Sequence, residues 1–266
     1  MKNRVIYYSD ELNDDFAGND IKTCVVDGSF VFKHKNIFWR IIEFIIYYII
    51  VAPLVYLFMK VYHGLKFKNR RVVRSLYKRG YLLYANHTQT FDSFLPAIAS
   101  FPKKGFVIAN PDAVSIPFIR NLVLMLGCIP IPTAHSGMRS FLDRVYGIIK
   151  RKGSITIFPE AHIWPYYTKI RPFKDVSFRY PVKADVPVIP MVTTYRKRRG
   201  LFALSRRPAM TVTVCEPIFP DTSLPQREAI KKLRDETYEA MKKVSETNEN
   251  IEYVKYIKTP PDQSPE

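Results

Sequence analysis

A histidine and an aspartate are the first residues whose types and spacing suit chemistry. His87 and Asp92 stand five positions apart, directly after the apolar run Tyr81–Ala85. Such a run is typical of a strand covered on both faces, and ligands of open α/β sheets bind outside the carboxyl ends of the strands. A carboxylate that holds one imidazole nitrogen leaves the other nitrogen free to take a proton. The pair therefore indicates general-base chemistry, although a histidine that caps a turn and an aspartate that caps a helix would show the same spacing.

Further along the chain, a second apolar run at residues 154–158 also leads to a carboxylate, Glu160. Together with the first pair, it belongs to a series of four blocks in a fixed order. The blocks are Asn86-His87 to Asp92, Ile116-Pro117-Phe118-Ile119, Phe158-Pro159-Glu160 and Val186-Pro187-Val188-Ile189-Pro190. In these blocks the chain resembles the lysophospholipid (1-acylglycerol-3-phosphate) acyltransferase family, membrane enzymes that move a fatty acyl group onto a glycerophosphate-type hydroxyl. The resemblance spans roughly residues 64–220.

The resemblance implies transfer of an acyl group from an acyl thioester, either acyl-CoA or acyl-carrier protein, to a lysophospholipid or lysophosphatidate-type acceptor. It assigns the general base to His87, the orientation of that base to Asp92, and a role in binding the acceptor to Glu160. A thioester is already reactive, so we expect neither a metal nor a cofactor. Two alternatives remain open, a membrane-bound lipid-binding protein with a decayed site and a hydrolase of acyl esters.

Two positions depart from the family pattern. Ala161-His162-Ile163 follows Glu160 where the family has Gly-Thr-Arg, and Thr133 stands where a basic residue often contacts the phosphate of the acceptor. A buried phosphate needs a cation, because an unpaired ion costs several kcal/mol to desolvate. The candidates are Lys169, Arg171, Lys174 and Arg120, of which we hypothesise that Lys169 and Arg171 take the role. If the acceptor lacks a terminal phosphate, Arg171 would instead face the membrane.

Residues 37–61 form a long apolar segment whose charges are Arg40, Glu43 and Lys60. Its length lies near the ~20 residues that a bilayer-spanning helix needs. The segment therefore predicts a membrane-embedded helix, and both a full span and insertion into one leaflet are open. Arg40 and Glu43 are one helical turn apart, so they are expected to pair near one interface.

Basic residues dominate the chain and gather directly after this segment. The formal net charge is +17, and Lys66, Lys68, Arg70, Arg71 and Arg74 follow the helix with no acidic residue among them. This pattern predicts anionic membrane lipids as a partner and places the catalytic domain on the cytoplasmic face. No nucleic-acid-binding signature accompanies the charge, so no nucleic acid is expected. The three scattered cysteines indicate neither a disulfide framework nor a zinc site.

Short apolar runs alternate with helical patterns after residue 62, which predicts an α/β fold. We expect a layered α/β/α domain with a largely parallel mixed sheet, preceded by the membrane-embedded helix. The acyltransferase domain should span residues 62–258, and a proline-rich disordered tail should occupy residues 259–266. Residues 1–36 lack the pattern of a cleaved targeting peptide, and their role cannot be read.

Overall fold

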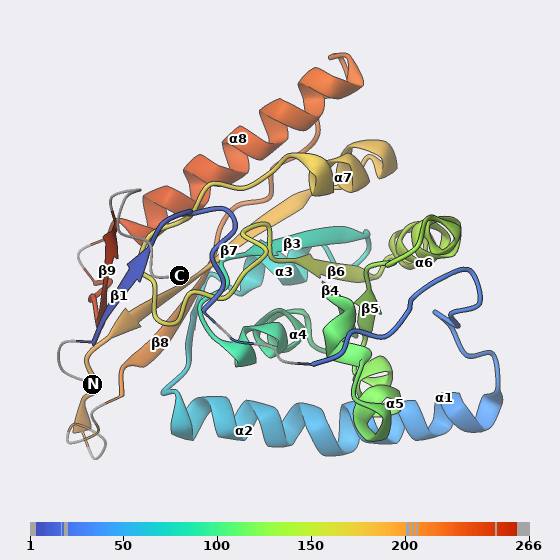
Figure 1. Cartoon of the computed structure of the whole chain (residues 1–266), viewed down its shortest axis with the longest axis horizontal. Coiled ribbons are helices and arrows are strands. Elements are labelled where there is room, and N and C mark those ends of the chain that lie inside the picture. Colours follow the sequence, from blue (N-terminus) through green and yellow to red (C-terminus); the bar gives the residue numbers. More distant parts are fainter. Residues whose placement is uncertain are drawn as a thin grey trace.

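A mixed sheet forms the centre of the molecule in the computed structural model, which describes residues 4–16, 18, 21–200, 203, 205, 207–247 and 249–259 (Figure 1). Within these residues the sheet has seven strands in the order β2-β8-β7-β3-β6-β4-β5. β7 and β8 run antiparallel, and the other neighbours run parallel. The strands are β2 (Lys66–Lys68), β3 (Tyr81–Ala85), β4 (Gly105–Ala109), β5 (Cys128–Pro130), β6 (Ser154–Ile157), β7 (Val188–Arg196) and β8 (Ala209–Val214).

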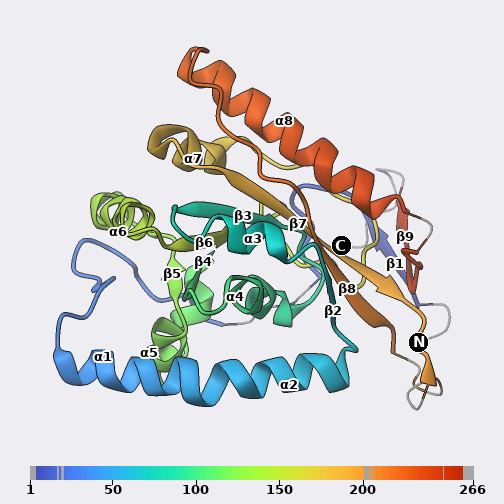
Figure 2. The ribbon, with the colours of Figure 1, turned by 180° about the vertical axis from the view of Figure 1, so that it is seen from behind.

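Helices cover both faces of this sheet. α6, α7 and α8 lie on one face, and α2, α3 and α4 lie on the other (Figures 1 and 2). The helical segments are α1 (Ile37–Phe44), η1 (Ile45–Val51), α2 (Ala52–Tyr62), α3 (Arg71–Ser75), η2 (Thr90–Phe94), α4 (Leu95–Ser100), η3 (Pro111–Val114), α5 (Pro117–Met125), η4 (His135–Gly137), α6 (Met138–Lys150), η5 (Val176–Phe178), α7 (Arg179–Ala184) and α8 (Gln226–Ser245). The predicted α/β/α fold is therefore confirmed.

Strand β3 shows why the sequence folds this way. All five of its residues are buried, as its uninterrupted apolar run predicts. Leu82 and Tyr84 pack into the core under α6, α7 and α8, whereas Tyr81 and Leu83 pack into the core beside α2, α3 and α4. The alternation of side chains along a strand thus serves two cores at once.

The N-terminal helix, composed of α1, η1 and α2, is continuous over Ile37–Tyr62. It is long and apolar enough to cross a membrane, and only 6% of its most apolar window is buried. The expected pairing of Arg40 with Glu43 is wrong, because the Glu43 carboxylate binds the Lys104 ammonium of the globular domain. Next to this ion pair, the Tyr47 hydroxyl accepts a hydrogen bond from Gly105 N at 2.9 Å. The inner side of the helix is therefore fastened to the start of β4.

Both ends of the chain meet in a small second sheet. β1 (Arg4–Tyr8) and β9 (Val254–Lys258) pair in parallel. The predicted disordered tail, residues 259–266, lies outside the described residues except for Thr259, whose backbone N–H donates to Tyr8 O at 2.8 Å. The N-terminal region, for which the sequence indicated no role, thus contains a strand that is held against the last strand of the chain.

Candidate active site

The end of β3 places His87 at the carboxyl edge of the sheet. Directly after the strand, the Asn86 side chain accepts from Thr193 N at 2.8 Å and donates to Thr193 O at 3.1 Å. These two bonds connect the end of β3 to its neighbour β7. The backbone of the next residue is therefore fixed before it leaves the sheet.

His87 and Asp92 lie together, as the sequence predicts. The His87 Nδ1 atom is 3.6 Å from an Asp92 carboxylate oxygen, and the two side chains are 13% and 1% exposed. The imidazole also stacks on Phe158, with ring centroids 4.2 Å apart. Because Nδ1 faces the carboxylate, Nε2 is the nitrogen left for proton transfer.

Asp92 also caps the turn that follows the strand. The same oxygen that faces His87 accepts backbone N–H bonds from Thr88 at 2.5 Å and Gln89 at 2.7 Å. These donors hold the carboxylate in position within the first turn of η2. The helix-capping alternative and the catalytic interpretation are therefore compatible, since one carboxylate makes both sets of contacts.

Glu160 joins the end of β6 to the end of β3. One of its oxygens accepts from His87 N at 3.0 Å, and the other accepts from Arg171 N at 3.0 Å. Burial raises the pKa of Glu160, and the Arg171 guanidinium and the two N–H donors oppose that rise. The carboxylate is 1% exposed and lies behind the backbone of His87, so the geometry makes it a positioning group. The acceptor-binding role expected for Glu160 has no direct support in these contacts.

The alternative in which Arg171 faces the membrane is wrong, and a phosphate clamp at this residue conflicts with its contacts. Its guanidinium is 0% exposed and its Nη2 lies 3.5 Å from Glu160. The same group donates to Glu11 O at 3.2 Å, donates to His162 O, and stacks over the Trp164 ring at 4.8 Å. Arg171 therefore neutralises a buried carboxylate of the protein. The sequence could not show this, because it reveals the charge of a residue and not its burial.

The other predicted cations lie nearer the surface. Lys169 and Lys174 are exposed, and Arg120 is half-buried with its Nε donating to Val114 O at 2.8 Å. Thr133 contacts the N-terminal region, since its hydroxyl accepts from Val26 N at 2.9 Å. None of these contacts joins Lys169, Lys174 or Arg120 to His87, so the role of these three cations toward an acceptor stays a prediction.

The departure from the family pattern after Glu160 preserves a tight turn. Ala161 has a φ of 65°, in the left-handed region that favours glycine, which is the residue the family has at this position. The His162 backbone N–H donates across this residue to Glu160 O at 2.8 Å. Alanine thus takes up the conformation of the missing glycine at some steric cost.

The N-terminal segment 8–16 supports this loop, a contribution that sequence reasoning missed. Asp14 O accepts from the Trp164 indole N–H at 2.8 Å, and an Asp15 carboxylate oxygen lies 3.3 Å from His162 Nδ1. The Tyr8 and Phe16 rings pack against the same indole. The aromatic loop is therefore covered by the start of the chain and does not lie bare against a membrane.

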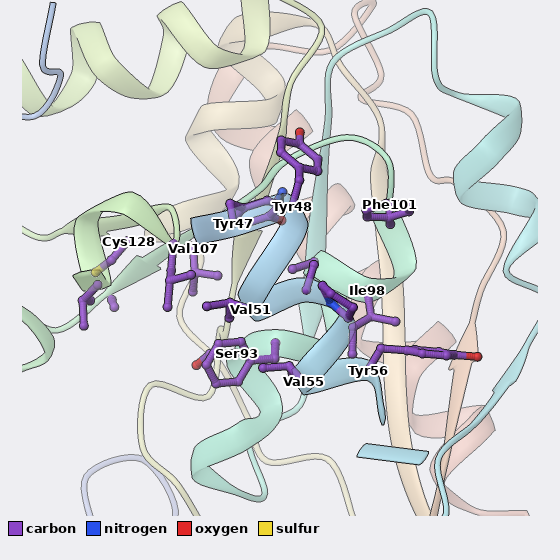
Figure 3. Close-up of a pocket in the computed structure, with 18 of the residues that line it drawn as sticks. Tyr47, Tyr48, Val51, Val55, Tyr56, Ser93, Ile98, Phe101, Val107 and Cys128 are labelled. Carbon is purple, nitrogen blue, oxygen red and sulfur yellow. Dashed lines mark hydrogen bonds between the residues drawn. The ribbon is translucent and has the colours of Figure 1, made fainter. Parts of the chain in front are cut away.

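A large apolar cavity lies between the N-terminal helix and the sheet (Figure 3). Its volume is about 450 Å³. Val51 and Val55 line it from the helix, and Val107 lines it from β4. Ser93 and Phe94, which directly follow Asp92 in the chain, line it as well. The turn that carries Asp92 therefore borders a space suited to a hydrocarbon chain.

Metal-ligating groups are not gathered at this site. Across the described residues, no group of three or more His, Cys, Asp and Glu side chains is arranged to hold a metal ion.

Comparisons with known proteins agree with the fold and the motifs. A family model described as Acyltransferase matches residues 63–194. The chain is 25% identical over 214 residues to a 1-acyl-sn-glycerol-3-phosphate acyltransferase of Saccharomyces cerevisiae. The match covers 73% of this chain and 66% of the yeast protein. It thus spans slightly less than two thirds of the length of the yeast protein.

A solved structure shows the same fold. The crystal structure of the 1-acyl-sn-glycerophosphate (LPA) acyltransferase PlsC from Thermotoga maritima matches with a TM-score of 0.54 and 19% identity, covering 79% of this chain and 88% of that chain. The protein thus has an acyltransferase-type α/β fold with a histidine and an aspartate at its sheet edge. Residues 63–194 thus match the acyltransferase family that the order of the sequence blocks predicts.

Proposed function

We propose that this protein is an O-acyltransferase of the 1-acylglycerol-3-phosphate type, with His87 as its general base. The observation that carries the proposal is the placement of His87 Nδ1 at 3.6 Å from the buried Asp92 carboxylate. Hydrogen bonds of catalytic groups are often long before substrate binds, so this distance suits an orienting contact. The match of residues 63–194 to the Acyltransferase family model supports the reaction type.

The reaction balances without a covalent acyl-enzyme. The acceptor hydroxyl attacks the carbonyl carbon of the thioester while His87 Nε2 takes its proton. The C–S bond then breaks, and the imidazolium returns a proton to the thiolate of the leaving CoA or carrier protein. Asp92 holds the imidazole in the tautomer that this cycle requires. The reactive thioester makes a metal or an organic cofactor unnecessary.

The cavity supports a fatty acyl substrate. Its volume of about 450 Å³ falls within the ~300–1,000 Å³ of ligand pockets. Nearly all of its lining is apolar, and it borders the turn that carries Asp92. An acyl chain in this space would end with its thioester near the edge of the sheet where His87 stands.

A lysophosphatidate-type lysolipid is the acceptor we propose, since the yeast relative is named for that acceptor class. Its phosphate requires a cation that the protein does not already use internally. Arg171 is occupied by Glu160, so the proposal assigns this role to Lys169, with Arg120 and Lys174 as the other candidates.

The catalytic domain is proposed to sit on the cytoplasmic face of a membrane, with the N-terminal helix parallel to the bilayer plane. The domain contacts this helix over the stretch from Glu43 to Tyr62. Lys104 of the domain pairs with Glu43, and Arg198 of the domain donates to the Tyr62 carbonyl. That stretch is ~28 Å long, nearly the ~30 Å thickness of the hydrocarbon core. A helix perpendicular to the bilayer would therefore pull the polar domain into the hydrocarbon, and a helix in the plane of one leaflet would not.

Substitution of the base tests the mechanism. His87→Ala should lower acyl transfer to lysophosphatidate by ~10²-fold to 10⁴-fold, with folding and membrane association unchanged. His135→Ala, which removes an exposed imidazole in η4, is the matched control and should keep full activity. Near-normal transfer by His87→Ala would refute the mechanism.

The same assay distinguishes the alternative functions. The purified protein is incubated with an acyl thioester, with and without a panel of lysolipids, and free thiol is measured. Thiol release that requires an acceptor supports transfer. Release without an acceptor would indicate a hydrolase, and no release under either condition would indicate a lipid-binding protein.

A further inference from the structure

Helix α5 presents an apolar face that the proposed chemistry does not use. Phe118 is the most exposed large apolar side chain among the described residues, at 97%. Leu122 lies one turn further along the same face, Ile119 lies beside it, and both are also exposed. The helix contains no acidic residue, and its one charged side chain, Arg120, donates to Val114 O at the helix start. The exposed face is therefore entirely uncharged.

Helix α5 lies across the apolar cavity from the N-terminal helix. In both views α5 descends to the level of that helix (Figures 1 and 2). The apolar cavity lies between the two elements, with Val123 and Leu126 of α5 on one side and Val51 on the other. On its outer side the N-terminal helix exposes further large apolar residues, among them Ile49 and Leu57. The two helices thus expose apolar side chains on either side of one cavity.

We propose that α5 is a second membrane-inserted element, which enters the same leaflet as the N-terminal helix with Phe118 at its tip. The proposal rests on the proposed in-plane position of the N-terminal helix. A bilayer fits this surface better than a protein partner does, because the surface continues that of a helix apolar enough for a membrane, on a chain with a net charge of +17.

Insertion of α5 has a consequence for the substrate. With both helices in the leaflet, the cavity between them faces the acyl chains of the lipids. A fatty acyl chain then reaches the cavity sideways from the membrane, without crossing water. Phe118 and its neighbours would thereby keep the cavity in contact with hydrocarbon.

Site-specific fluorescence tests this position. A polarity-sensitive dye is attached at Phe118→Cys in full-length protein in which Cys24, Cys128 and Cys215 are replaced by alanine, and transfer activity of the unlabelled protein checks its fold. The protein is reconstituted in vesicles of phosphatidylethanolamine and phosphatidylglycerol. Quenching by iodide reports exposure to water, and quenching by doxyl-labelled lipid reports exposure to hydrocarbon. Leu57→Cys on the N-terminal helix and Glu239→Cys on the exposed side of α8 are the matched sites.

The expected result is a blue-shifted dye at position 118 that loses iodide quenching and gains quenching by doxyl lipid, as at position 57. The dye at position 239 should stay fully open to iodide. Iodide access at 118 together with lipid quenching at 57 would place α5 in water and overturn the inference. Protection from both quenchers at 118 would show that protein covers α5, and this also overturns it. Loss of lipid quenching at 57 would overturn both the inference and the in-plane helix, while leaving the acyl-transfer chemistry untouched.

Discussion

Replacement of Arg171 by methionine tests how the catalytic site is held together. The guanidinium of Arg171 and the carboxylate of Glu160 are 0% and 1% exposed, with Nη2 3.5 Å from the carboxylate. Removal of one partner leaves the other charge buried without compensation, which costs ~3–5 kcal/mol. In a protein of this size, this corresponds to a fall in Tm of roughly 6–20 °C. Thermal unfolding in detergent, followed by fluorescence, measures this change.

The same substitution should reduce catalysis on every acceptor. Both Glu160 oxygens accept backbone N–H bonds, from His87 and from Arg171, each at 3.0 Å. If the carboxylate moves, the backbone of the general base moves with it, and a displacement of ~1 Å can cost ~10²-fold in rate. We expect kcat/KM to fall by a similar factor on lysophosphatidate and on a lysolipid with a neutral headgroup.

A double variant and an exposed control refine this experiment. Glu160→Gln combined with Arg171→Met leaves no buried charge, so it should regain part of the lost stability. Lys169→Met in the same loop is exposed and should change the free energy of unfolding by less than ~0.5 kcal/mol. The reasoning is refuted if Arg171→Met keeps the wild-type Tm and loses activity on lysophosphatidate alone, since that pattern belongs to a phosphate clamp.

Three further predictions follow from the site and its surroundings. Asp92→Asn should lower kcat by ~10²-fold or more, and combining it with His87→Ala should add little, because the two residues act as a unit; single-turnover transfer assays measure both. Val51→Phe should fill part of the cavity and shift the preference toward shorter acyl thioesters, as read from competition between donors of different chain length. Burial lowers the pKa of His63 below its usual 6.5. Below about pH 6.5 the unfolded chain therefore binds the proton more readily than the folded chain, and the stability of the folded protein should fall as the pH is lowered. His63→Gln should show a shallower loss of Tm between about pH 7.5 and pH 5.5, and equal slopes would contradict this account.

The contact between His87 and Asp92 could be predicted because its determinants are local. The apolar run Tyr81–Ala85 specifies a doubly covered strand, and the strand end places His87 and Asp92 within one turn of each other. The layered fold could be predicted for a related reason. The central strands and the longer helices carry their own apolar patterns, and short connections leave few arrangements.

Other features depended on contacts between distant residues. β1 pairs with β9, which lies about 250 positions later in the chain, and no local pattern in either strand shows which strand it pairs with. The length of the N-terminal helix could be read from its composition. Its attachment to the domain could not, because that depends on Glu43 meeting Lys104, 61 positions later. The burial of Arg171 likewise follows from the fold and not from its charge.

The altered block after Glu160 is therefore weak support for a decayed site. The carboxylate acts through backbone N–H groups, so the side chains that follow it can change without disturbing His87. Ala161 still takes up the left-handed conformation at the position of the family's glycine, with a φ of 65°. Ile163 stands where the family has an arginine, and Arg171 is directed inward to Glu160. The substitution at position 163 therefore changes which cation is offered to the acceptor. The departures from the family pattern therefore bear on recognition of the acceptor, and the arrangement that holds His87 beside Asp92 is intact.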